Sequence, residues 1–222
     1  MSNNNPDKSM PNGMDPEELK IHQSTVRHTE VEGWTPELPE TNRVATLMAE
    51  VDAETQRAIE RFLYEEVQVL DDLDWEKWLD FLSDDLVYWA PVQEERYARE
   101  RRENRIKKFG TSVYFEENKI QMKQRVDRLL TNMAWGEEPP SRARHVISNI
   151  RVSKGPRDGE FIVKSNFYDY RSNGQRYHDS VTGERTDIIV KDENSMWGFL
   201  VKERFVLFDM AMILNKNLSL FY

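Results

Sequence analysis

Apolar residues recur at helical intervals in the first half of the chain, from about residue 55 to residue 133. Spacings of three and four residues place such side chains along one side of a helix, so three helices are expected here. Asp74 stands where the second helix begins and is expected to cap it. The three apolar stripes are Ile59, Phe62, Leu63, Val67 and Leu70; then Trp75, Trp78, Leu79 and Leu82; then Met122, Val126, Leu129, Leu130 and Met133, in a helix around 116–133.

Strand composition dominates from Ser141 onward. Four long segments are rich in β-branched and aromatic residues, and the turn signals GPRDG and SNG separate neighbouring ones: RHVISNIRV, EFIVKSNFYDY, RYHDSVTGERTDIIV and MWGFLVKERFVLFDM. One earlier strand, LVYWAPV, ends at Pro91, and Thr182-Gly183 predicts a bulge or bend in the third long segment. Three helices followed by a meander predict an α+β fold, in which about three helices cover the concave face of a curved, mixed or antiparallel sheet.

The first 42 residues differ from the rest, because proline and glycine are frequent there and apolar residues follow no period. We expect residues 1–42 to form an extended arm and residues 43–222 to form one domain, a length that suits a single core. Residues 96–108 hold seven cations, with glutamates between them. They are interpreted as a solvated loop or as an arm that docks onto an acidic surface.

Charge and composition narrow the class of protein. The net charge of −9 and the isoelectric point near 5.1 argue against nucleic acid or an anionic membrane as the main partner. The chain shows neither a long apolar span nor a signal-peptide pattern, and a cytoplasmic location is expected. With no cysteine and four histidines that show no Rieske spacing, the chain itself is expected to hold no metal or other cofactor.

The segment YEEVQVLDDLDWEKWLDFLSDDLVYW carries nine carboxylates. Five of them fall off the apolar stripes and are expected to be solvated, and three others are expected at helix ends: first Glu65, Glu66, Asp72, Glu76 and Asp80, then Asp74, Asp84 and Asp85. Asp71 lies at the end of the first stripe and can turn inward, where His145 is its natural partner. The pair is either a general acid/base couple or a hydrogen-bonded core histidine that joins helix to sheet.

Several motifs together resemble one family. They are FLYEEVQVLDDLDWEKWLDFLSDDLVYWAPV, the later WGEEPPSRARHVISNIRV, and the final NLSLFY. From about residue 55 onward the chain resembles the small, or beta, subunit of Rieske-type aromatic-ring-hydroxylating dioxygenases of the naphthalene and biphenyl dioxygenase kind.

That resemblance implies a cone-shaped α+β fold shared with scytalone dehydratase and ketosteroid isomerase. It also implies an oxidoreductase complex of three alpha and three beta subunits, in which the alpha subunit holds the Rieske [2Fe-2S] centre and a mononuclear iron. A reductase, often through a ferredoxin, would deliver electrons from NADH or NADPH, and the complex would convert an arene and O2 to a cis-dihydrodiol. The beta subunit would be mainly structural, with no catalytic residue of its own.

Two functions are therefore weighed. The first is a non-catalytic structural subunit that stabilises the hexamer, with these interface candidates: Trp135, Arg142, Arg144, Leu218, Leu220, Phe221 and Tyr222. The alternative is a stand-alone cone-fold lyase or isomerase that uses Asp71 and His145. It is weakened by the lack of a second pocket histidine and by large side chains expected to fill the cone, namely Trp75, Trp78, Phe167 and Phe205.

Overall fold

The computed structural model describes most of the chain beyond residue 50. The described residues are 51–93, 112–131, 133–137, 139–174, 177–210, 212–213, 215 and 220–222. The arm expected over residues 1–42, the basic segment 96–108 and Leu218 lie outside this part of the chain.

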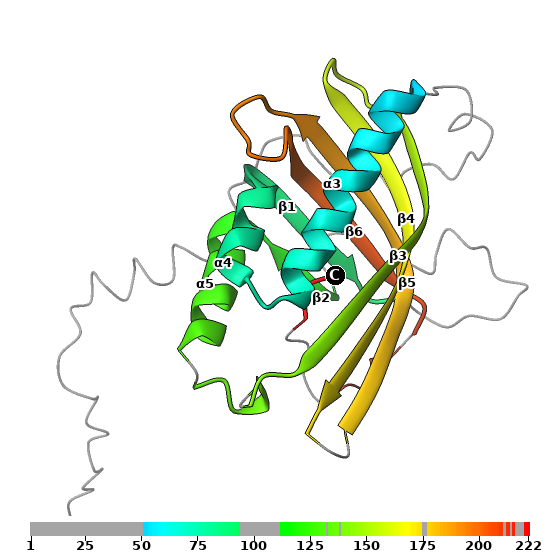
Figure 1. The fold of residues 1–222 in the computed structure, drawn as a ribbon. Coiled ribbons are helices and arrows are strands. Elements are labelled where there is room, and N and C mark those ends of the chain that lie inside the picture. The colour runs from blue at the N-terminus through cyan, green and yellow to red at the C-terminus, as the bar shows by residue number, and fades with distance from the viewer. Residues whose placement is uncertain are drawn as a thin grey trace, which may run out of the picture. The chain divides into compact units, whose positions relative to one another are not determined.

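A six-stranded mixed sheet forms the frame of the described residues, in the order β2-β1-β6-β5-β4-β3. Its strands are β1 (Leu82–Pro91), β2 (Val113–Glu117), β3 (Arg142–Lys154), β4 (Glu160–Asn173), β5 (Tyr177–Lys191) and β6 (Phe199–Phe208). Neighbouring strands are antiparallel, except that β1 runs parallel to β6. The sheet curves, and helices lie within the curve (Figure 1).

The helices begin where side chains cap them. Asp52 accepts a hydrogen bond from the backbone of Thr55 at the start of α3 (Ala53–Asp71), and Asp74 caps the short α4 (Trp75–Trp78) as expected. A 3₁₀ turn, η1 (Leu79–Phe81), follows α4 directly. Asn118 and Gln121 form a reciprocal capping box at α5 (Lys119–Leu130), and a further 3₁₀ turn, η3 (Trp135–Glu137), precedes β3.

The α+β fold predicted from the sequence is confirmed, including the curved sheet and the three helices. Strand β2 was not foreseen, because it is only five residues long and its last two residues, Glu116 and Glu117, were expected to begin the third helix. Asp84 and Asp85 do not end a helix, since both lie inside β1. The second helix is also shorter than its apolar stripe suggested, because Leu82 already has extended backbone.

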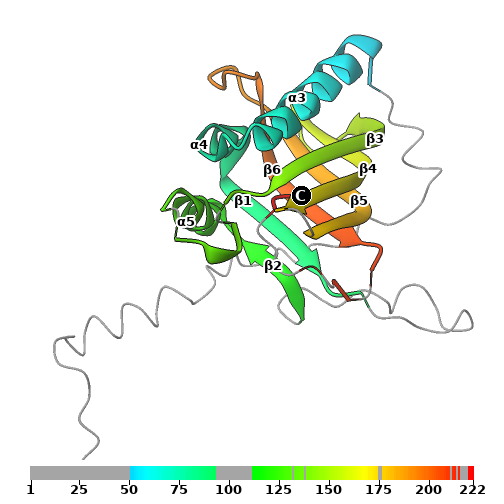
Figure 2. The same ribbon diagram turned by 60° about the horizontal axis from the view of Figure 1, so that its bottom comes forward.

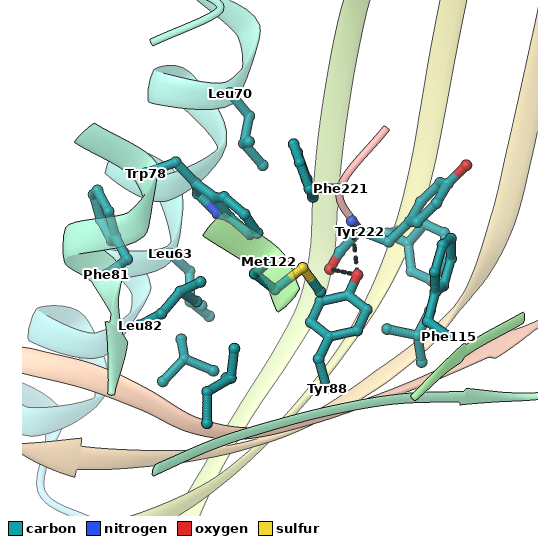
Figure 3. Close-up of a cluster of buried hydrophobic side chains, with 14 of the residues drawn as sticks. Leu63, Leu70, Trp78, Phe81, Leu82, Tyr88, Phe115, Met122, Phe221 and Tyr222 are labelled. Atoms are coloured by element: carbon teal, nitrogen blue, oxygen red, sulfur yellow. Dashed lines mark hydrogen bonds between the residues drawn. The ribbon is translucent and has the colours of Figure 1, made fainter. Parts of the chain in front are cut away.

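The space between α3 and the sheet is filled by large side chains (Figure 3). Trp78 stacks on Phe221 with ring centroids 4.2 Å apart, and Tyr222 packs edge-on against Phe208 at 4.9 Å. The phenol of Tyr88 donates to the backbone oxygen of Tyr222 and accepts from its backbone nitrogen. Residues 221–222 therefore lie inside the core, beneath α3 and against the sheet (Figure 2).

Gly183 does not mark the bulge that the sequence predicted. Register through Gly183 is continuous with both β4 and β6, and the irregularity of β5 lies between Ile188 and Ile189. A Cβ at residue 183 would sit 2.8 Å from the ring of Phe167 and closer still to the backbone oxygen of Leu207. Glycine is needed at this position because an aromatic ring packs directly over the strand backbone.

We expect Gly183→Ala to lower the free energy of unfolding by about 1–3 kcal/mol, because the added methyl overpacks a closed part of the core. Urea denaturation followed by circular dichroism measures the change. Ser180→Ala, at a partly exposed position of the same strand, is the matched control and should change stability by no more than about 0.5 kcal/mol. Equal stability of the two variants would contradict this account of Gly183.

Candidate functional site: a buried ionic cluster and an aspartate–histidine clasp

Glu66 lies at the centre of the interior, which corrects the expectation that it is solvated. Its exposed fraction is 0%, and that of Arg204 is 1%. The two side chains form a bidentate pair with nitrogen–oxygen distances of 2.6 and 2.9 Å. Counting three and four residues along α3 from Leu63 and Phe62 reaches Glu66, so the helical spacing alone could have placed it on the buried face.

Arg204 also binds Asp187, with its Nε 2.9 Å and its second amino group 3.1 Å from the two carboxylate oxygens. The guanidinium nitrogens of Arg185 lie 3.1 Å from a carboxylate oxygen of Asp187 and 3.6 Å from one of Glu66. Neither contact has the geometry of a hydrogen bond, so Arg185 contributes only its charge. The indole of Trp78 donates to Glu66 at 3.2 Å. These residues, called the ionic cluster from here on, join α3, α4, β5 and β6: Glu66, Trp78, Arg185, Asp187 and Arg204.

The ionic cluster stays charged despite its burial. Burial alone would raise the pKa of Glu66, but the charges of Arg204 and Arg185, with the hydrogen bonds from Arg204 and Trp78, lower it to about 2. Burial likewise opposes the charge of Arg204, yet Asp187 and Glu66 hold its pKa well above its usual value. A permanently ionised pair has no proton to exchange near neutral pH, so it acts as a structural element.

Asp71 and His145 meet as the sequence predicted. One oxygen of Asp71, the last residue of α3, lies 2.7 Å from His145 Nδ1 and also accepts the backbone N–H of His145 at 3.0 Å. The other oxygen accepts from Arg144 at 2.7 Å. Burial favours the neutral carboxyl, but these bonds and the charges of His145 and Arg144 lower the pKa of Asp71.

This contact fastens α3 to the edge of the sheet. Strand β3 is an edge strand, and Asp71 accepts a hydrogen bond from the backbone N–H of His145, which faces away from β4. Near the other end of α3, Gln56 accepts from the backbone of Val152 and donates to that of Ile150. An exposed edge strand invites pairing with other chains, and α3 satisfies this edge at two points. The Asp71–His145 pair therefore holds the end of α3 against the edge strand of the sheet.

Asp169 lies opposite His145 across the β3–β4 pair and is also buried. Burial raises its pKa to about 6, against the lowering effect of His145 and Arg185. Burial lowers the pKa of His145, but the Asp71 hydrogen bond and the charges of Asp169 and Asp71 outweigh it, and the net shift is upward. The imidazole is thus held between two carboxyl groups.

Little free space adjoins this group. The cavity beside His145 has a volume of about 10 Å³, which is roughly the space of one water molecule. Leu70, Leu129, Leu220 and Phe221 are among the residues that line it. An organic substrate has no room next to the imidazole. The geometry of the pair suits acid/base chemistry, but its surroundings do not.

The described residues contain no group of three or more histidine, aspartate or glutamate side chains that could hold a metal ion. None of the helices described there is both long enough and apolar enough to cross a membrane.

The interface candidates fall into three groups. Arg142 is exposed at the start of β3, whereas Arg144 is exposed but paired with Asp71. Phe221 and Tyr222 are almost fully buried in the core of this chain, with Leu220 packed partly beside them. Trp135 begins η3, and its side chain, like Leu218, is outside the described residues. Phe221 and Tyr222 can therefore support an interface only by fixing the course of the tail.

The fold and the filled interior define the class: a cone-type α+β domain whose centre is an ionic cluster in place of a pocket. The family model for the ring hydroxylating beta subunit matches residues 65–215, and the chain belongs to that family. It is 36% identical over 184 residues to the biphenyl 2,3-dioxygenase subunit beta of Rhodococcus jostii, covering 82% of this chain and 96% of the relative. It is 35% identical over 176 residues to the chlorobenzene dioxygenase subunit beta of a Cupriavidus species, covering 78% and 92%.

Solved structures share the fold. Naphthalene 1,2-dioxygenase with indole bound superposes with a TM-score of 0.73 at 21% identity, covering 95% of this chain and 100% of the other. A proposed scytalone dehydratase from Novosphingobium aromaticivorans gives a TM-score of 0.51 at 16% identity, covering 75% and 89%. The chain is thus a beta subunit of the ring-hydroxylating type, and the resemblance seen in its sequence is confirmed.

Removing the cation at the centre of the ionic cluster should be costly. We expect Arg204→Met to lower the free energy of unfolding by about 3–5 kcal/mol, because Glu66 and Asp187 would remain buried without compensation. Urea denaturation at neutral pH measures the loss. Arg57→Met, at an exposed position of α3, is the control and should stay within about 0.5 kcal/mol of the parent. A loss for Arg204→Met no larger than that of the control would contradict the role of the cluster.

The group around His145 predicts that stability falls as pH rises. The pKa of Asp169 is about 6 in the fold, whereas its ordinary value is 3.8. The stability that Asp169 contributes is therefore complete below pH 3.8 and is lost as the pH rises through 6. The raised pKa of His145 acts in the same direction above 6.5. In Asp169→Asn, the decline in unfolding free energy from about pH 5.5 to about pH 8.5 should be smaller by about 1 kcal/mol. Parallel pH profiles for variant and parent would refute the assignment.

Proposed function

We propose that this chain is the non-catalytic, supporting beta subunit of a multicomponent aromatic-ring-hydroxylating dioxygenase. The complex would convert an arene, O2, NAD(P)H and a proton into a cis-dihydrodiol and NAD(P)⁺, so that both oxygen atoms enter the product. The observation that carries the supporting role is the filled interior: an ionic cluster and stacked aromatic rings occupy the space between α3 and the sheet.

The catalytic partner is proposed to be an alpha subunit that holds the Rieske [2Fe-2S] centre and the mononuclear iron, in a cytoplasmic assembly of three alpha and three beta subunits. Electrons would come from a reductase, through a ferredoxin where one is present. The relatives at 36% and 35% identity are named as beta subunits of biphenyl and chlorobenzene dioxygenases, which supports an aromatic hydrocarbon as substrate of the complex.

The surfaces proposed for contact with other subunits include Trp135, Arg142, Arg144 and the tail around Leu218 and Leu220. The buried rings of Phe221 and Tyr222 would hold that tail in place. The arm over residues 1–42 is proposed to become ordered against a partner, with residues 43–222 as the single folded domain.

Expression of the full chain alone and together with a ring-hydroxylating alpha subunit tests the proposal. We expect the isolated chain to contain no iron and to leave naphthalene and biphenyl unchanged in the presence of reductant and O2. The co-expressed chains should purify as one complex that contains iron, because the metal ligands are supplied by the alpha subunit. Metal analysis, solution mass and product chromatography are the measurements.

Two results would contradict the proposal. One is failure of the chain to co-purify with any iron-containing subunit. The other is turnover by the isolated chain, and turnover that His145→Gln abolished would support the Asp71–His145 lyase or isomerase in its place.

A further inference from the structure

The outer face of the sheet, away from α3, carries exposed aromatic residues on neighbouring strands. Val146 pairs with Tyr168 and Arg144 pairs with Tyr170 across β3 and β4. The exposed fractions of Val146, Tyr168 and Tyr170 are 46%, 45% and 39%. Tyr170 also stacks on His178 of β5, with ring centroids 6.5 Å apart. Together with Arg142, these residues form the aromatic–arginine face: Arg142, Arg144, Val146, Tyr168, Tyr170 and His178.

The composition of this face is that of a protein-binding surface. Tyrosine and arginine are enriched among the residues that carry binding energy at protein interfaces. Arg144 is held by Asp71 of its own chain, so the charge that this face offers to a partner is mainly that of Arg142. The cross-strand neighbours on β4 and β5 include no carboxylate: Tyr168, Tyr170, Ser172, His178, Ser180 and Thr182. The face therefore suits a partner surface that is acidic.

An acidic surface of this kind lies on the chain itself. Asp72, Asp74, Glu76 and Asp80, called the acidic corner, are all exposed around α4. The one lysine among them, Lys77, lies 5.5 Å from the ring of Trp197, to which its charge is directed. Both views place α4 on the opposite side of the described domain from β3, β4 and β5 (Figures 1 and 2). The corner and the face therefore cannot meet within one chain.

We propose that the aromatic–arginine face binds the acidic corner of a second copy of this chain. Contact between two identical faces is disfavoured, because it would bury the charge of Arg142 against a surface that offers it no free carboxylate. A head-to-tail contact instead pairs opposite charges, and when its rotation closes it produces a ring of copies. The inference rests on the proposed function, in which sister beta subunits are in contact, and it assigns the two surfaces that they use.

Two sets of substitutions separate the halves of this contact. The face variant carries Arg142→Glu, Tyr168→Ser and Tyr170→Ser. The corner variant carries Asp72→Lys, Glu76→Lys and Asp80→Lys, and leaves Asp74 as the cap of α4. Controls are Arg57→Glu and Asp158→Lys, which reverse exposed charges outside both surfaces. Circular dichroism and thermal unfolding confirm that each variant is folded.

The solution mass of the full chain, measured by sedimentation velocity, is expected to be a multiple of 26.4 kDa for the parent and both controls. Each variant alone should associate more weakly by on the order of a hundredfold or more, because several central interface residues are lost. An equal mixture of the two variants should form a heterodimer, since the intact corner of one meets the intact face of the other. This recovery of binding is specific to a head-to-tail contact.

Three outcomes would overturn the inference. The corner variant could assemble like the parent, which would indicate contact between identical faces or at another surface. The mixture could stay monomeric. The face variant could keep the parent mass but lose a co-expressed alpha subunit, which would assign the face to that partner. Failure of the proposed function is distinguishable, because it appears as missing iron and missing co-purification whatever the mass of the isolated chain.

Discussion

A fully buried arginine held by two carboxylates is the constraint on which the described structure depends. Arg204 of β6 binds Glu66 of α3 and Asp187 of β5, and all three are almost inaccessible to water. Charges can remain in such a place only when each is paired and hydrogen-bonded, so the helix must lie over the sheet in one position. The backbone oxygen of Tyr222 also accepts from Arg204, which extends the same constraint to the end of the tail.

This arrangement decides what the Asp71–His145 pair can do. The distance between the two side chains and the shifted pKa values resemble those of an acid/base couple. Phe221 helps to close the adjacent cavity to about the size of a water molecule, and both oxygens of Asp71 are engaged by β3. The same residues that could move a proton in an open cone hold a helix against an edge strand in this filled one. Membership in the beta-subunit family agrees with that reading.

A domain with a closed interior acts through its surfaces. The outer side of β3–β5 displays tyrosines and arginines, and the region around α4 displays carboxylates. The fold produces both surfaces. Alternation along β3 and β4 sends His145 and Asp169 inward and the residues next to them outward, and α4 exposes its polar side to solvent. The long acidic segment that includes α4 is thus mostly surface, with Glu66 and Asp71 as its two inward members.

The sequence by itself determined the α+β class, the approximate helices, five of the six strands, the cap at Asp74 and the partnership of Asp71 with His145. These features depend on local spacing and on residue chemistry, which a single chain displays directly. Tertiary structure decided the burial of Glu66, the pairing of short strand β2, the reason for Gly183 and the closure of the interior by Phe221 and Tyr222. Each of these depends on partners far away in the chain, such as Arg204 for Glu66. Helical spacing can place Glu66 on the buried face of α3, but a charged carboxylate stays there only because the distant Arg204 pairs with it, and no local pattern reveals that cation.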